Sequence, residues 1–264
     1  MEKAGNGILE HVKDSHYYDI FGYHLKLPEI PPVKVLGITF DFSITRMVVL
    51  LWIAALIISL CFFFSFRKRK LIPSKLGILL EYVILYIRDN IAYPILGRKL
   101  GDKYFPLIST LFLFILVCNL LGLVPLLGSP TSNLSVTSGL AIIVFVIIVL
   151  EGIKQHGLLG YFKSFIPGGI PAWLIPVMLP LEVLGLFIRI IVLAVRLFAN
   201  MVSGHINIVV LFFLIIFLKT YLISPFSFGI ALFVSLLEIL VAFIQAYIFT
   251  MLSAIFISMS VKSH

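Results

Sequence analysis

The sequence predicts an all-α integral membrane protein with about five transmembrane helices and one interfacial amphipathic helix. Of the 264 residues, 61% are hydrophobic and only 12% are charged, whereas about 25% of the residues in an ordinary soluble domain are charged. The mean hydropathy is +1.16, and no long polar stretch remains to form a second, soluble domain. These values exclude a soluble enzyme that is tethered by one anchor.

The expected elements follow from the apolar runs and from the charges that separate them. A helix of about 20 apolar residues spans the hydrocarbon core of a bilayer. The five spans are expected at about residues 44–66, 105–127, 139–153, 172–218 and 228–260. Residues 73–97 instead mix apolar positions with two acidic and two basic residues, which favours a helix that lies in the membrane interface over the alternative of a sixth full span.

Basic residues indicate the orientation in the membrane. Nine of the 20 Lys and Arg residues fall between Arg67 and Lys103, and membrane proteins retain such residues in cytoplasmic loops. Residues 1–43 are therefore expected to form an extracytoplasmic N-terminal segment, and residues 44–264 the membrane domain. The N-terminal segment lacks the continuous apolar core of a signal peptide. The net charge of +8 then reflects topology, and no nucleic acid is expected as a partner.

Residues 181–218 are apolar almost throughout and would extend roughly 57 Å as one helix. Two spans with a turn near residues 200–205, or one strongly tilted helix, would account for this length. The charged loops favour a single crossing, because it returns Lys262 to the cytoplasmic side. The last expected span, 228–260, is also longer than an upright helix needs, so both helices are expected to be tilted.

Several polar side chains fall within these two apolar helices. A charge near the bilayer centre costs at least ~2.5 kcal/mol, so such residues face water or a partner. At about 100° per residue, five side chains of the first helix share a face within roughly 60°. These five are Glu182, Arg189, Arg196, Asn200 and Ser203. His205 projects about 180° from this face, and Glu238 shares a face of the last helix with Gln245.

This set of residue types suits proton transfer. An arginine keeps its charge at any accessible pH, whereas Glu and His take up and release protons, and Asn, Gln and Ser orient water. The pattern therefore predicts a proton path that is interrupted by the fixed charge of Arg196, whose acidic partner comes from elsewhere in the protein or from another subunit. Snorkelling at helix ends or purely structural ion pairs are the alternative.

No cofactor or metal site is expected. Cys61 and Cys118 lie in separate apolar runs, without the spacing of a disulfide framework or of metal ligands. His11, His16 and His24 are irregularly spaced in the N-terminal segment and are expected to be solvated.

Two segments resemble the signature helices of subunit a of F-type ATP synthases. They are residues 196–205, RLFANMVSGH, and residues 237–249, LEILVAFIQAYIF. Supporting matches occur in family order at residues 119–125, 130–137 and 173–177. The resemblance implies a proton-translocating subunit that is not catalytic by itself and that couples proton flow to ATP synthesis.

In the family, two half-channels carry protons to and from the carboxylates of a c-subunit ring. The resemblance implies that Arg196 is the essential arginine, that Asn200, His205, Glu238 and Gln245 belong to the outer half-channel, and that Glu182 lies in the cytoplasmic one. Arg189 is expected to be accessory. The implied partners are the c ring, the b subunits of the peripheral stalk, the rest of the synthase and membrane lipid. The expected location is a bacterial inner membrane, with an organellar one as the alternative.

Two departures from the family pattern leave alternatives open. His205 and Glu238 are exchanged relative to many bacterial members, so the order in which they titrate is open, and Asn133 stands where an acid is common. The choice between H⁺ and Na⁺ is also open, because ring residues largely set it. An ion-coupled secondary transporter is the alternative function, although no internal repeat is found.

Overall fold

The computed structural model describes the backbone of residues 17–20, 23–26, 33–35, 38–40, 43, 45–67, 74–124, 129–164, 174–218 and 224–261. Within these ranges, side chains are described except at 17–40, 158–159, 162–164, 205, 208–209, 211–218, 224–228 and 231. The chain divides into two compact units. The first comprises Met1–Phe63, Phe114–Asn133 and Phe198–Phe243, and the second comprises Phe64–Leu113, Leu134–Leu197 and Ile244–His264.

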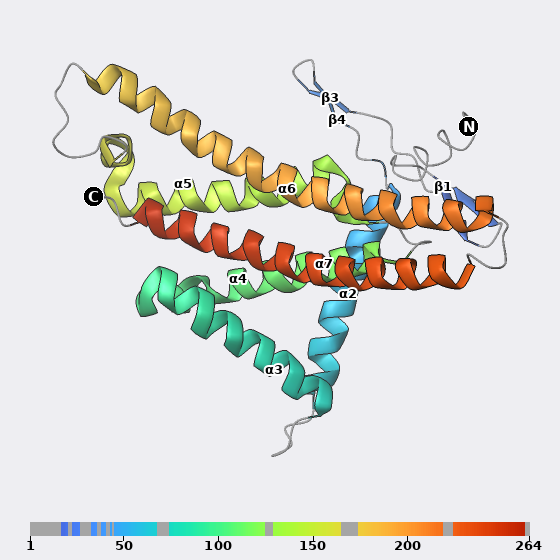
Figure 1. Ribbon diagram of the computed structural model, residues 1–264. Helices are drawn as coiled ribbons and strands as arrows, with labels where there is room; N and C mark the ends of the chain where they lie inside the picture. Colours follow the sequence, from blue (N-terminus) through green and yellow to red (C-terminus); the bar gives the residue numbers. More distant parts are fainter. Residues whose placement is uncertain are drawn as a thin grey trace. The chain divides into compact units, whose positions relative to one another are not determined.

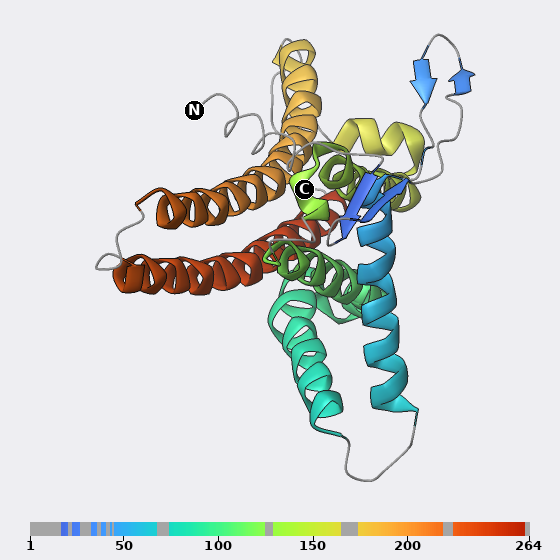
Figure 2. The same ribbon diagram turned by 90° about the vertical axis from the view of Figure 1, so that its right-hand side faces the viewer.

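The N-terminal segment contains two short antiparallel hairpins, which the sequence pattern does not predict. Strand β1 (Tyr17–Ile20) pairs with β2 (Tyr23–Lys26), and β3 (Val33–Val35) pairs with β4 (Ile38–Phe40). Each hairpin is visible as a pair of arrows in Figure 2. Strands of three or four residues carry too few alternating positions to stand out from the surrounding polar sequence.

Five helical segments of the described residues are long and apolar enough to cross a membrane, which confirms the expected number. They are Arg46–Phe66, Lys75–Gly122, Leu134–Gly157, Ile175–Gly204 and Leu232–Val261. The first is helix α2 (Arg46–Phe66), which exposes large apolar side chains such as Trp52 and Phe64. Exposed apolar side chains are favourable on a surface that faces lipid.

The second segment is bent. Helix α3 (Lys75–Ile87) begins at Ser74, whose hydroxyl accepts a hydrogen bond of 3.2 Å from the backbone N–H of Gly77. A π-helical turn, η1 (Arg88–Ala92), joins it to α4 (Tyr93–Gly122). Gly97 interrupts α4 with φ 75°, a conformation that favours glycine. The kink at Gly97 coincides with the expected end of the interfacial helix, whereas α4 ends at Gly122, before the expected residue 127.

Helix α5 (Leu134–Ser164) packs against the first half of α6 (Ile175–Leu218) within the second unit, and the two lie side by side in Figure 1. Ala141, Ile190 and Ala194 form a buried cluster there. The rings of Phe145 and Phe187 extend it, with centroids 5.4 Å apart. Small residues at this contact allow the helices to approach closely.

Helix α6 runs unbroken for 44 residues (Figure 1), which confirms one long helix over two spans with a turn near residue 200. Helix α7 (Ser224–Val261) is also long, with 38 residues. In the second unit, the C-terminal end of α7 is fixed by two serines. The hydroxyl of Ser258 donates to the carbonyl of Ile95 at 2.9 Å, and that of Ser260 donates to the carbonyl of Ile148 at 2.7 Å.

Candidate functional site

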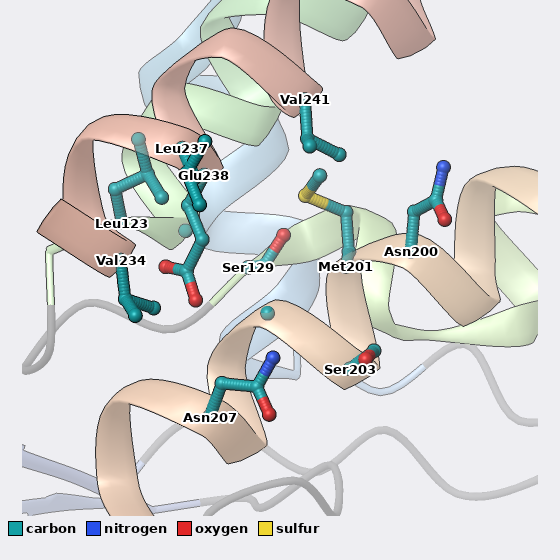
Figure 3. A pocket seen from close by; sticks show the side chains of 12 residues that line it. Leu123, Ser129, Asn200, Met201, Ser203, Asn207, Val234, Leu237, Glu238 and Val241 are labelled. Atoms are coloured by element: carbon teal, nitrogen blue, oxygen red, sulfur yellow. The ribbon is translucent and has the colours of Figure 1, made fainter. Parts of the chain in front are cut away.

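A cavity of about 350 Å³ lies within the first unit. Its walls are formed by the end of α4, by residues 129–133 (the Ser129 segment), and by the facing sides of α6 and α7 (Figure 3). Its lining residues are Gly122, Leu123, Ser129, Asn200, Met201, Ser203, Gly204, Asn207, Val234, Leu237, Glu238 and Val241. A cavity of this size with polar side chains in its wall has room for several water molecules.

Among the described residues that line the cavity, Glu238 is the one with a titratable side chain. Its side chain extends from α7 toward α6 (Figure 3), and the residue is only 8% exposed. Neither carboxylate oxygen has a hydrogen-bond partner among the described residues. A buried carboxyl group is stabilised by hydrogen bonds to water or by a proton, and the cavity next to Glu238 supplies the space for water.

Helix geometry explains why these residues meet. Asn200, Ser203 and Asn207 of α6 are spaced by three and four residues, so they share one helical face. On α7, Val234, Leu237, Glu238 and Val241 follow the same spacing. A polar face of α6 therefore lies opposite a mostly apolar face of α7 that carries one acid.

Gly204 allows the acid to approach α6 closely. A Cβ atom on Gly204 would lie 3.6 Å from both Cδ and Oε1 of Glu238. This is ordinary van der Waals contact, and any longer side chain would enter the space next to the carboxylate.

Buried hydrogen bonds connect Ser129 to α4 and α7. The amide Nδ2 of Asn119, on α4, donates to the carbonyl of Ala242 on α7 at 3.3 Å, and its Oδ1 accepts from Oγ1 of Thr131 at 2.8 Å. Oγ1 of Thr131 also lies 2.8 Å from Oγ of Ser129. Asn119 and Thr131 are fully buried.

In the second unit, Arg189 and Glu182 form an ion pair on α6. Nη2 of Arg189 lies 3.5 Å from Oε1 of Glu182, and the side chains are 38% and 39% exposed. Their spacing of seven residues places them two turns apart on one helical face, as the sequence predicts.

Arg196 also belongs to the second unit, where it is exposed. No described residue forms an ion pair or hydrogen bond with its guanidinium group. Exposed apolar residues flank it on α6, including Val192 and Val195. An arginine within a membrane-spanning helix requires an anionic or hydrated partner.

The structure brings together three of the sequence-predicted site residues, Asn200, Ser203 and Glu238, around one cavity. Gln245 is buried on α7 in the second unit. The side chain of His205 lies outside the described residues. No group of three or more potential metal ligands occurs in the described part of the chain.

Several lining residues are missing from the sequence prediction. Asn207 follows Asn200 by seven residues, so the same periodicity that selected the other polar residues of α6 would have found it. Ser129 and Gly122 carry no such signal, because their place in the wall depends on how α4 and the following segment pack.

Long apolar helices define the class, a multi-pass helical membrane protein, and within it a partly polar cavity lies next to one buried acid. Residues 48–258 match the family model described as ATP synthase A chain. The chain belongs to this family, that of ATP synthase subunit a, the proton-translocating and non-catalytic Fo subunit. Membership confirms the expected function, proton translocation by an ATP synthase subunit, and not the alternative of a secondary transporter. It also implies association with the synthase complex.

Relatives support this assignment over nearly the whole chain. The chain is 43% identical to ATP synthase subunit a of Chloroherpeton thalassium over 260 residues, which cover 96% of this chain and 76% of the relative. It is 45% identical to ATP synthase subunit a of Myxococcus xanthus over 224 residues, covering 84% and 74% of the two chains. ATP synthase subunit a 2 of Chlorobium luteolum is 42% identical over 272 residues, covering 98% and 76%.

Proposed function

We propose that the cavity around Glu238 is part of the outer half-channel, through which protons reach the rotor. The carrying observation is the buried carboxyl group of Glu238, which has no hydrogen-bond partner among the described residues and lies at the edge of a cavity of about 350 Å³. Water in the cavity would pass protons to and from this group, while the side chains of Asn200, Ser203 and Asn207 would orient that water. A carboxyl group next to water can act as a proton relay.

Arg196 is proposed as the fixed charge that separates the outer and inner half-channels. It is exposed and has no described ion-pair partner, and it precedes Asn200 by one helical turn. An exposed guanidinium group in an apolar span would be paired with an anion of another subunit. The proposed anion is the carboxylate of a c-ring subunit, which Arg196 would hold in its ionised form as it passes.

Glu182 is proposed to carry protons in the cytoplasmic half-channel. The side chain of Glu182 is 39% exposed and pairs with Arg189. These observations support a solvated carboxyl group that is held on one face of α6. Arg189 would then be accessory, because it orients Glu182 and does not itself exchange protons.

His205 and Gln245 are proposed to complete the outer half-channel. The support for this is their place in the chain: His205 follows Gly204, which lies against Glu238, and Gln245 follows Glu238 by seven residues on α7. The further proposed partners are the b subunits of the peripheral stalk, and the proposed location is a bacterial plasma membrane, as the bacterial relatives suggest.

Proton flux in vesicles that contain the whole synthase tests this proposal. Arg196→Ala is expected to abolish ATP-driven proton pumping and proton-driven ATP synthesis, while the complex still assembles. Assembly is checked by the amount of the chain that copurifies with the c ring. Coupled pumping by an assembled Arg196→Ala complex would contradict the proposed role.

A further inference from the structure

Three hydrogen bonds in the first unit connect α7, α4 and the Ser129 segment, and only one arrangement of protons satisfies them. The carbonyl of Ala242 can only accept, so the amide of Asn119 must donate to it. The oxygen of the same amide then accepts from Thr131. A hydroxyl group carries a single proton, so in the contact between Ser129 and Thr131 the donor is Ser129.

This chain of hydrogen bonds joins two walls of the cavity. Ala242 follows Glu238 by four residues, so it lies one turn further along the same side of α7. Ser129, at the other end of the chain, lines the cavity together with Glu238. Asn119 therefore connects the turn of α7 beyond the acid to the part of the wall that Ser129 forms.

Gly122 provides the space for this arrangement. A Cβ atom on Gly122 would lie 2.4 Å from Cβ and 2.6 Å from Oγ of Ser129, closer than real atoms approach. Ser129 therefore packs directly against the backbone of α4 at Gly122, which lies about one turn after Asn119. Every donor and acceptor of the chain is buried, so the loss of any one partner leaves another unsatisfied.

We propose that Asn119 and Thr131 are positioning residues for proton transfer at Glu238. They hold the helical turn of α7 that contains Ala242 at a fixed distance from the Ser129 segment. In this way they fix the direction of the Glu238 carboxyl group and the width of the cavity that it faces. This inference rests on the proposed outer half-channel. It adds to that half-channel a group of residues that never exchange the transported proton.

The test uses the whole synthase in vesicles and measures ATP synthesis per assembled complex as a function of the outer proton concentration. Thr131→Val keeps the shape of the side chain but removes its donor. The maximal turnover is expected to fall about tenfold, because the rate of a reaction depends steeply on the position of the reacting group. The half-saturating proton concentration is expected to change as well. Thr131→Ser keeps the hydroxyl and is expected to restore most of the turnover.

Thr250→Val is the matched control. Thr250 is fully buried like Thr131, but its hydroxyl donates to the carbonyl of Ala246 in its own helix. It is expected to leave turnover and half-saturation unchanged. A purely structural role of Thr131 would lower the amount of complex and leave the turnover of each assembled complex intact.

Unchanged turnover and half-saturation in Thr131→Val would overturn the proposal, as would a Thr131→Ser variant that is no better than Thr131→Val. If Thr131→Val does not assemble, Ser129→Ala decides, since it removes only the last hydrogen bond. It is expected to lower turnover to a smaller extent, and normal turnover would overturn the proposal. Glu238→Gln, assayed in parallel, tests the half-channel itself: if it transports normally, the proposed function fails, whatever the outcome for Thr131.

Discussion

Gly204 of α6 and Glu238 of α7 lie in near contact at the edge of the cavity: a Cβ atom on Gly204 would be 3.6 Å from Oε1 of Glu238. The residues are 34 positions apart in the chain. Their approach leaves the carboxyl group facing the α6 backbone on one side and the cavity on the other. The geometry at this contact sets how large a side chain position 204 can carry.

Gly204→Ala is expected to transport protons within about twofold of the unmodified complex, because its Cβ would make only ordinary contact with Glu238. Gly204→Leu is expected to reduce acid-driven proton flux about tenfold or more, because the longer side chain displaces the carboxyl group or the water beside it. Gly139→Leu is the control, since nothing lies within 4 Å of a Cβ atom there. Equal flux in Gly204→Leu and Gly139→Leu would contradict this expectation.

Glu238→Gln is expected to slow proton transport more than Glu182→Gln. Glu238 is buried and has no described hydrogen-bond partner, and it is the acid on the cavity wall that could relay protons. The side chain of Glu182 is 39% exposed, and water around it can carry protons when the side chain no longer does. The measurement is acid-driven flux through the membrane sector in vesicles, and the reverse order of effects would identify Glu238 as a structural acid.

Gly122→Ala is expected to displace the Ser129 segment, because the new Cβ atom would lie 2.4 Å from Cβ of Ser129 and 3.2 Å from its Cα. The amount of assembled complex or its proton flux should therefore fall. Adding Ser129→Gly removes the side chain that is struck and should restore part of the loss. Gly139→Ala serves as the control, and a Gly122→Ala complex that assembles and transports normally would argue against this packing.

Lys103 on α4 and Glu151 on α5 form an ion pair in the second unit. The Glu151 side chain is only 15% exposed, so removing one charge of the pair leaves the other poorly solvated. Glu151→Lys and Lys103→Glu are each expected to lower the amount of chain in the membrane, and the double exchange is expected to restore it. Quantitative blotting of membranes measures this, and additive losses in the double variant would exclude a direct interaction.

The helical plan could be predicted from the sequence because it rests on local properties. The number of spans depends on apolar runs, and the single long helix α6 agrees with the position of charges around residues 181–218. The spacing of Glu182, Arg189, Arg196, Asn200 and Ser203 places them on one helical face by periodicity alone. The two N-terminal hairpins were not predicted, because such short strands leave little pattern.

The cavity could not be predicted, because it depends on contacts between distant segments. Asn119 and Ala242 are 123 residues apart, and nothing in the sequence near either of them specifies the other as a partner. Likewise, the glycine at position 122 reads as an unremarkable helical residue until Ser129 is found where its side chain would be.

The sequence by itself determined the class of protein, the number of candidate membrane spans and the family, because hydropathy and motif order are properties of consecutive residues. It also selected Glu238 as a buried acid. Only the tertiary structure decided that Glu238 faces a cavity, that Gly204 lets it approach α6, and that Asn119 ties the two walls together. Those features arise when side chains from separate helices compete for the same space and for the same hydrogen-bond partners.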